Sequence, residues 1–391
     1  MLVKKKILAV TGIRSEYDYL HPILKKFQNA EFDVLVVICG AHLSSLHGET
    51  YKIIENDGFE IADKIDCLLN TDRIVQRSKG VGFLISSLSQ TVERVKPDFL
   101  LVVGDREESI ATCIVGNYMN VLTIHYGGGD PVYGNADDPI RLACSKLAHI
   151  HCVTTEQYAN NLLNISEDKW RILNSGSTSY ANIASIPLKD KDVLSEYLKL
   201  DIQNKGYFVF LKHPLSSEMH DSYKQMYFAL ETAAKFAEDN DLYIIGIYPN
   251  SDPGSVEILR AIEELEGKYS CIRFYKTIPR DIFVNIIRNA LCLVGNSSMG
   301  ILEAPYYKLP VVNIGNRQKG RLNAGNVIFV DYNRDDIVNA IKKSCYNDKY
   351  RSTIKDLVNP YGDETSVDKI YDFINSIDLH DRKWYVKSNL C

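Results

Sequence analysis

The stretch Leu293–Pro305, LVGNSSMGILEAP, predicts a buried strand, a small polar turn and the start of a helix. The apolar run ALCLV (290–294) stops at Gly295, and three small polar residues follow before the helical pattern begins. Asn and Ser are preferred caps of any helix, so the turn can be an ordinary one. A helix N-terminus also offers unpaired N–H groups and a partial positive charge, which suit a phosphate. On these residues alone, both interpretations stay open.

Size and composition exclude several classes of protein. A chain of 391 residues is too long for one ordinary core, so we expect two domains. A net charge of -5 argues against a nucleic-acid partner. No apolar run approaches the length of about 18 residues that a membrane span needs, and Ile7–Val10 is far shorter than a signal-peptide core. Nine cysteines without CxxC pairs fit buried, reduced thiols in a cytosolic protein.

Short β-branched runs alternate with longer helical patterns along the chain, which is typical of a parallel sheet covered by helices on both faces. The strands expected in the first half are Lys6–Thr11, Asp33–Cys39, Phe99–Val103, Val121–His125 and His149–Thr154. Those expected in the second half are Tyr207–Leu211, Leu242–Ile247, Cys271–Tyr275, Leu291–Val294, Val311–Ile314 and Val327–Val330.

The alternation breaks near Ser175 in the small-residue segment NSGSTSYANIASIP and restarts at Tyr207. We therefore expect an α/β protein with two doubly wound, Rossmann-like domains, residues 1–175 and 176–364, joined near 175–205. The carboxyl ends of parallel strands are where such sheets bind ligands, so the active site should lie in the cleft between the domains.

Polar or charged residues stand directly after the expected strands, where they should line that cleft. They are Arg14, His42, Asp105, His125, His213, Asn250 and the GNSS turn. A guanidinium such as that of Arg14 can pair with a phosphate. Each residue also has an ordinary explanation: a surface arginine, a helix cap at Asp105, or a turn histidine at His213.

The segment GGGDPVYGNADDPIR (127–141) is harder to explain as scaffold alone. Consecutive glycines cost backbone entropy and usually mark a positive φ or a close approach to a ligand. They lead to Asp130 and then to the pair Asp137 and Asp138. One member of the pair is expected to cap a helix whose first residue is Pro139, which leaves the other for chemistry.

Several kinds of site lack their sequence signatures. TGIRS is not the GxGxxG fingerprint of a dinucleotide site, so a nicotinamide cofactor is not expected. There is no HExxH or CxxC spacing for a metal and no GxSxG elbow for a serine nucleophile. The remaining carboxylates, histidine, arginine and serine-rich turn suit acid–base chemistry on a substrate with a phosphate leaving group.

Four segments carry a resemblance to a known family. TGIRSEYDYL, GAHLSSLHGETYKIIENDGF, VVGDREE and GNSSMGILEAPYYKLPVVNIGNRQKGR resemble the hydrolysing UDP-N-acetylglucosamine 2-epimerases of sialic and legionaminic acid biosynthesis, from Ile7 to about Arg321. The resemblance implies the GT-B architecture, with a C-terminal helix (about 365–391) packed on the first domain. It also implies a cytoplasmic enzyme that needs no metal or cofactor, acts on a nucleotide sugar, and forms a homodimer or homotetramer.

The resemblance also implies roles for individual residues. Ser297 and Ser298 would hold the nucleotide diphosphate, which favours the phosphate interpretation of the opening stretch, and Glu303 would bind the ribose. His213 matches a histidine near the diphosphate and the leaving oxygen. Asp105 and Asp138 match two acids of the family.

The implied reaction is an elimination followed by a hydration. A base removes the C2 proton while the C1–O bond to the diphosphate breaks, which gives a glycal. Water then adds at C1 and a proton returns to C2 on the other face. Arg14 and the GNSS turn would offset the charge of the departing diphosphate.

One segment departs from the family pattern. Family members usually read HIHGGE, whereas this chain reads TIHYGGGD, which is about two residues longer and ends in Asp130. Because aspartate is one methylene shorter than glutamate, Asp130 can replace that acid only if the longer loop brings its backbone inward. The change also fits a different sugar, such as a 2,4-diacetamido-trideoxyhexose.

Three rival interpretations remain. A non-hydrolysing epimerase would carry HVEAGLR in this region, and this chain does not. A GT-B glycosyltransferase shares the fold and would need an acceptor site. The altered acid also fits a nucleotide-sugar binding protein without activity. The sequence leaves open which hexosamine is bound and whether the base is uracil or guanine.

Overall fold

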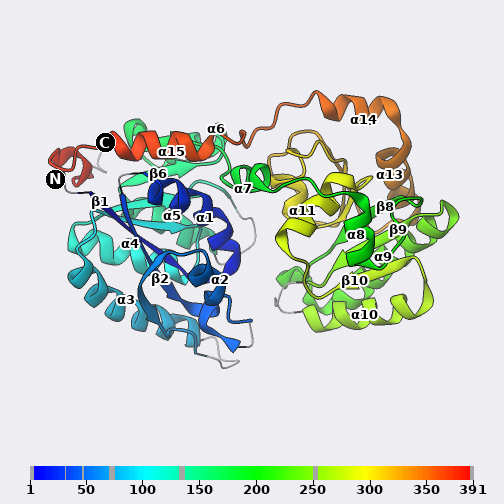
Figure 1. Cartoon of the computed structure of the whole chain (residues 1–391), viewed down its shortest axis with the longest axis horizontal. Helices are drawn as coiled ribbons and strands as arrows, with labels where there is room; N and C mark the ends of the chain where they lie inside the picture. Colours follow the sequence, from blue (N-terminus) through cyan, green and yellow to red (C-terminus); the bar gives the residue numbers. More distant parts are fainter. Residues whose placement is uncertain are drawn as a thin grey trace. The chain divides into compact units, whose positions relative to one another are not determined.

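The computed structural model describes residues 4–30, 32–45, 48–69, 75–131, 137–249 and 254–387, and it gives only the backbone of residues 137, 138 and 216. The chain divides into two compact units (Figure 1). The first unit contains residues 1–182 and 361–391, and the second contains residues 183–360. The boundaries expected from the sequence were 175 and 364. Each unit is described by itself below.

The first unit is built on a parallel sheet in the order β3-β2-β1-β4-β5-β6-β7. Its strands are β1 (Lys5–Thr11), β2 (Phe32–Cys39), β3 (Glu60–Ile65), β4 (Phe99–Val103), β5 (Leu122–Tyr126), β6 (Ile150–Val153) and β7 (Ile172–Asn174). The chain builds outward from β1 in one direction and then from β4 in the other, so the strand order reverses between these two neighbours. A reversal of this kind opens a crevice at the carboxyl ends of the strands.

Helices cover both faces of this sheet because successive strand residues point to opposite sides. Ile7 and Ala9 pack against α1 and α15, whereas Leu8 and Val10 pack against α3, α4 and α5. The helices of this unit are α1 (Arg14–Gln28), η1 (Gly40–Leu43), α2 (Tyr51–Asn56), α3 (Val75–Val95), α4 (Glu107–Met119), α5 (Asp137–Leu147), α6 (Glu156–Asn164), η3 (Lys169–Arg171), α15 (Ser366–Asn375) and η5 (Arg382–Trp384). Helix α7 (Ser179–Ser185) runs across the boundary between the units.

The C-terminal segment packs on the first unit, with α15 against α1 (Figure 1). Arg171 fastens the residues that follow α15. Its guanidinium is fully buried and donates hydrogen bonds to the backbone oxygens of His149, Lys383, Trp384 and Val386 at 2.6–3.0 Å. The helix expected over about 365–391 is therefore shorter, since α15 ends at Asn375, and the backbone at residues 383, 384 and 386 is held by a buried charge.

The second unit is built on a parallel sheet in the order β10-β9-β8-β11-β12-β13, with a reversal between β8 and β11. Its strands are β8 (Tyr207–Leu211), β9 (Tyr243–Ile247), β10 (Ile272–Tyr275), β11 (Leu293–Gly295), β12 (Val311–Ile314) and β13 (Val327–Val330). Its helices are α8 (Lys191–Leu198), η4 (Ser216–Asp221), α9 (Ser222–Asp239), α10 (Ser255–Lys268), α11 (Arg280–Asn289), α12 (Met299–Leu302), α13 (Arg334–Tyr346) and α14 (Asp348–Lys355). In the part of the chain that the structure describes, no helix is both long and apolar enough to cross a membrane.

Each expected strand overlaps an observed one, and four of them match in both bounds, namely β4, β8, β12 and β13. The sequence interpretation missed β3 and β7. Both are edge strands whose residues are mostly half-exposed. Charged residues interrupt β3 (EIADKI), and β7 (ILN) has only three residues, so neither shows the continuous apolar run by which the other strands are recognised.

The opening stretch forms the strand and turn as expected, but its helix is only one turn long. Helix α12 ends at Leu302, so Glu303 lies at its C-terminal end and not several residues inside a longer helix. Pro305 explains the early end, since a proline disfavours helical angles for the residue before it and supplies no N–H donor.

We predict that Arg171→Met destabilises the first unit strongly. The variant leaves buried carbonyl oxygens without donors, at about 1–3 kcal/mol for each group. A total loss of about 3 kcal/mol or more would lower the melting temperature by roughly 6–12 °C, as measured by scanning calorimetry. Arg382→Met, at an exposed neighbouring position, is the control and should change stability by less than about 0.5 kcal/mol. Equal melting temperatures for the two variants would contradict the role of the buried guanidinium.

Candidate active site

Two of the expected site residues lie where the strand order of the first sheet reverses. Arg14 is the first residue of α1 and follows β1 after a two-residue turn. Asp105 follows β4 and precedes α4. Because open α/β sheets bind ligands at such a reversal, both residues lie where a substrate is expected.

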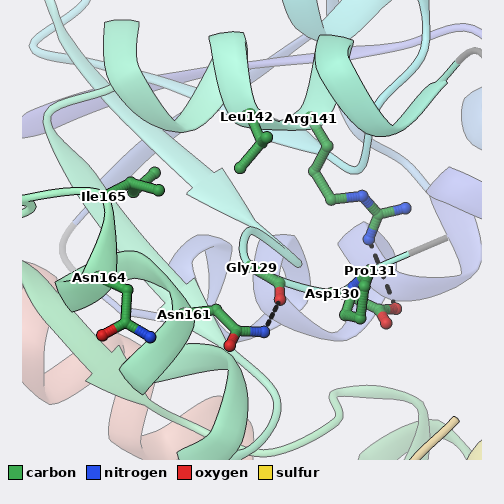
Figure 2. A pocket seen from close by; sticks show the side chains of 8 residues that line it. All are labelled: Gly129, Asp130, Pro131, Arg141, Leu142, Asn161, Asn164 and Ile165. Carbon is green, nitrogen blue, oxygen red and sulfur yellow. Dashed lines mark hydrogen bonds and ion pairs between the residues drawn. The ribbon is translucent and has the colours of Figure 1, made fainter. Parts of the chain in front are cut away.

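Asp105 binds an arginine and does not cap a helix. The cap position of α4 belongs to Arg106, and no side chain makes a capping hydrogen bond there. The Arg141 guanidinium, from α5, donates to Asp105 Oδ2 through Nε at 3.0 Å and also through Nη2. Its Nη1 donates to the Gly127 carbonyl at 3.0 Å and lies 3.4 Å from Asp130 Oδ2 (Figure 2). One guanidinium therefore joins two of the predicted catalytic acids.

The glycine loop places Asp130 against that guanidinium. Gly127 and Gly129 have φ values of +82° and +74°, which other residues rarely adopt. A Cβ atom on Gly129 would lie 2.4 Å from the Tyr158 carbonyl oxygen, so a side chain has no room there. The Asn161 amide donates to the Gly129 carbonyl at 2.8 Å. The loop is thus packed against α6, and Asp130 is directed toward Arg141.

A pocket of about 260 Å³ opens beside Asp130 (Figure 2). It combines apolar side chains with the amides of two asparagines, next to the Asp130–Arg141 pair. The residues that line it are Gly129, Asp130, Pro131, Arg141, Leu142, Asn161, Asn164 and Ile165. This mixture can receive a small group that has both carbon and amide character.

Two of the expected site residues lie outside what the structure describes. Asn250 is not among the described residues, and for Asp138 only the backbone is described. Helix α5 begins at Asp137, so Asp137 and Asp138 both belong to its first turn. The expectation that one of them caps a helix beginning at Pro139 is wrong, because Pro139 is the third helical residue.

His42 and His125 are buried and are held in the neutral form. His42 Nε2 lies 3.1 Å from Thr11 Oγ1, and its Nδ1 lies 2.7 Å from Thr50 Oγ1. Burial lowers the pKa of His42 to about 4. Burial also lowers the pKa of His125 to about 3, and its Nε2 lies 2.7 Å from the Gly104 carbonyl oxygen. Both side chains pack inside the first unit and do not line a cleft in this structure.

In the second unit, Asn296 joins the loops after β8 and β11, where the strand order reverses. Its side chain accepts a hydrogen bond from the His213 backbone N–H at 2.7 Å and donates to the His213 carbonyl at 2.9 Å. Ser297 Oγ accepts from the Met299 N–H at 3.3 Å, whereas Ser298 makes no capping bond. The structure therefore brings His213, Ser297 and Ser298 to one edge of the sheet.

Glu303 faces a cation in the same unit. Its Oε2 lies 3.5 Å from Arg280 Nη2, and its side chain is largely buried. Among the described residues, no group of three or more His, Cys, Asp or Glu side chains is placed to hold a metal ion.

Sequence reasoning missed two cations. Arg141 lies within a helix and not directly after a strand, where candidate site residues were sought. Its position one turn after the pair Asp137 and Asp138, in the segment that begins with the glycine loop, was a signal that could have found it. Lys212, next to His213, is 2% exposed, and its Nζ donates to the Tyr332 hydroxyl at 2.9 Å. Burial lowers the pKa of Lys212 to about 8.

The chain is similar to known proteins along most of its length. Residues 25–375 match the model of the UDP-N-acetylglucosamine 2-epimerase family. The chain belongs to that family. A relative from Neisseria meningitidis serogroup B, named UDP-N-acetylglucosamine 2-epimerase, is 31% identical over 95% of both chains. Another from Legionella pneumophila, named UDP-N,N'-diacetylbacillosamine 2-epimerase (hydrolyzing), is 30% identical over 96% of this chain and 97% of its own length.

A solved structure of this epimerase family shares the fold. The N. meningitidis UDP-GlcNAc 2-epimerase bound to UDP-GlcNAc has a TM-score of 0.80 and 18% identity, over 95% of this chain and all of that one. The expected fold class, with two Rossmann-like domains of the GT-B type, is confirmed by this match and by the two parallel sheets. The placement of the active site in a cleft between them stays a prediction.

We predict that Arg141 and Asp105 are energetically coupled in this epimerase. In a double-mutant cycle of Arg141→Met and Asp105→Asn, followed by urea unfolding, the coupling free energy should be about 1–3 kcal/mol. The two side chains are only 11% and 16% exposed, so solvent screens the pair weakly. The control pair is Arg77 and Glu107, whose arginine is 53% exposed, and its coupling should stay below about 1 kcal/mol. Equal coupling in both cycles would contradict the joint role of Arg141.

Proposed function

We propose that the protein is a hydrolysing 2-epimerase of a UDP-activated N-acetylhexosamine, and that it releases UDP and the free 2-epimeric sugar. The proposal rests on one observation: Asp105 and Asp130 both contact the Arg141 guanidinium, beside the strand-order reversal. The relative from Legionella pneumophila, named as a hydrolysing 2-epimerase, supports the hydrolysing reaction. UDP-GlcNAc and a UDP-2,4-diacetamido-trideoxyhexose are the two candidate substrates.

The acids suit the first half of the reaction. Asp105 or Asp130, both held by the Arg141 guanidinium, would act as the base that takes the C2 proton of the sugar. As the C1–O bond breaks, the electron pair of the C2–H bond forms the C1=C2 bond of a glycal, and UDP leaves with the electrons of the C1–O bond. General-base catalysis of this kind contributes about 10²–10⁴ in rate.

Hydration of the glycal completes the reaction. Water gives its hydroxyl to C1, and a protonated acid gives its proton to C2 from the face opposite to the one first attacked. The remaining proton of the water restores that acid, and the base loses the original C2 proton to solvent. The sum of the two halves is the consumption of one water molecule. We assign the second proton transfer to Asp138, since it stands on α5 one turn before Arg141.

We assign the nucleotide to the second unit. Ser297 and Ser298 would hold the diphosphate with His213, while Glu303 and Asn250 would bind the nucleoside. Helix α12 has a single turn, so hydroxyl and backbone N–H donors contribute more than a helix dipole, which grows with aligned peptide units.

Arg14 would contact the departing diphosphate from the first unit. We further propose a cytoplasmic homodimer or homotetramer that acts without a metal or cofactor. The sialic or legionaminic acid pathway is the proposed context, in line with the diacetylbacillosamine enzyme among the relatives.

We predict that proton NMR of a single incubation will detect UDP and a free 2-epimeric sugar. The enzyme would be mixed with UDP-GlcNAc, the UDP-2,4-diacetamido sugar and their GDP counterparts in separate tubes. Solvent deuterium at C2 of the product would report the proton exchange that the elimination requires. Transfer of the sugar to an added acceptor would favour a glycosyltransferase instead, and unchanged substrate in all four tubes would favour a binding protein.

We predict that Asp130→Asn lowers kcat by about 10²–10⁴ while UDP affinity stays nearly unchanged. The amide keeps the shape of the carboxyl group but cannot take a proton. Ser298→Ala is the control and should weaken UDP binding, seen by calorimetry, more than it lowers kcat. If Asp130→Asn retains near-full turnover on the true substrate, the aspartate does not replace the glutamate of the family pattern.

A further inference from the structure

Two buried glutamates lie beneath the strand-order reversal of the first sheet, and the proposed reaction uses neither. Glu16 belongs to the first turn of α1, and Glu108 belongs to the first turn of α4. Their residues are only 6% and 5% exposed. Because α1 follows β1 and α4 follows β4, the two acids come from the two sides of the reversal.

Both carboxyl groups meet at Gly12. Glu16 Oε2 accepts a hydrogen bond from the Gly12 N–H at 3.1 Å. A Cβ atom on Gly12 would lie 1.9 Å from Glu108 Oε1, and one on Gly40 would lie 2.6 Å from the same oxygen. The glutamate therefore fills the space that the side chains of these two glycines would occupy.

Gly12 also connects this pair to the candidate site. Its carbonyl oxygen accepts a hydrogen bond from the His42 N–H at 3.0 Å. Arg14 follows two residues later at the start of α1. A change in the position of Gly12 would therefore move the backbone of both His42 and Arg14.

Few cations offset the two negative charges. Arg106 Nε lies 3.7 Å from Glu108 Oε2, and Glu16 Oε1 has no hydrogen-bond partner within the described ranges. Burial raises the pKa of Glu16 well above its usual range, and the neighbouring Glu108 raises it further. Burial raises the pKa of Glu108 as well, against the opposing effect of Arg106. The other titratable or charged groups facing the pair are Cys39, Cys67, Arg77, Asp105 and Glu107.

We propose that Glu16 and Glu108 hold one proton between them and together keep the turn at Gly12 in the position that Arg14 needs to bind the substrate diphosphate. They are positioning residues, since they touch the turn and not the substrate. The part of the inference that concerns the diphosphate rests on the proposed function. The sharing of the proton does not.

The geometry explains why one proton is needed. With one acid neutral, a single negative charge remains beside the Gly12 N–H and Arg106. Loss of the second proton places two negative charges beside one glycine at a largely buried position, with the Arg106 side chain 3.7 Å from one of them. Two like charges in one site raise the pKa of one partner strongly for this reason.

The direction of the pH effect follows from the raised pKa values. A carboxyl group whose pKa is higher in the folded than in the unfolded chain contributes stability below the unfolded value, near pH 4.3. That stability is lost as the pH rises toward the folded value. The first unit should therefore lose stability with rising pH over the range in which these two groups give up their protons.

The test compares the wild type with the double variant Glu16→Gln/Glu108→Gln between pH 5 and 9. Glutamine keeps the shape and the hydrogen-bond acceptor of the carboxyl group but cannot ionise. The melting temperature of the wild type should fall, relative to the variant, by about 2–4 °C for each pH unit over part of this range. Glu156→Gln, at an exposed acid in the first turn of α6, is the control and should follow the wild-type curve. Parallel curves for the wild type and the double variant would overturn the proposal.

If the double variant does not fold, the same melting-temperature measurement on the single variant Glu108→Gln tests the proposal. In this variant Glu16 no longer has a like charge beside it. The melting temperature of the variant should therefore fall at a different pH from that of the wild type. A curve that coincides with the wild type would overturn the sharing of the proton.

UDP titration by calorimetry at pH 7 and 8.5 tests the link to Arg14. The wild type should lose at least about fivefold in UDP affinity relative to the double variant at the higher pH. Equal losses in both proteins would overturn the positioning role. If the wild type binds no UDP at either pH, the proposed function fails, while the melting curves still decide whether the acids share a proton.

Discussion

All strand pairs in the two described sheets are parallel, and this one constraint determines where polar residues can meet. A parallel neighbour can be reached only through a crossover, which in most cases here contains a helix that returns the chain to the other edge. The loops after the strands therefore collect at one edge. Gly12, Asp105 and the glycine loop, which are far apart in the chain, become neighbours for this reason.

The strand pattern made most of the fold predictable from the sequence. Central strands that are buried on both faces appear in the sequence as continuous apolar runs. The bounds expected from these runs agree closely with the observed ones, as at β4 and β8. The edge strands β3 and β7 were missed because charged residues interrupt β3 and because β7 has only three residues. The length of α12 was also missed, since Pro305 limits that helix more strongly than its apolar pattern suggested.

The candidate site was less predictable because its decisive contacts join distant residues. Asp105 carried a local signal, a lone acid after a strand, but its partner Arg141 comes from a helix far along the chain. The acids Glu16 and Glu108 resembled ordinary residues of a first helical turn, where negative charge is favoured. Only their common contact with Gly12 distinguishes them. Sequence patterns report spacing along the chain, whereas charge pairing depends on distance in space.

The return of the C-terminal segment to the first unit has a consequence for biosynthesis. Residues 4–182 emerge from the ribosome well before residues 383–386, whose backbone oxygens Arg171 binds, have been synthesised. The whole second unit emerges in between. Until then, Arg171 in the nascent first unit lacks the three backbone acceptors that the last segment supplies. The folding of this unit cannot be completed until residues 383–386 have been made, although its synthesis began first.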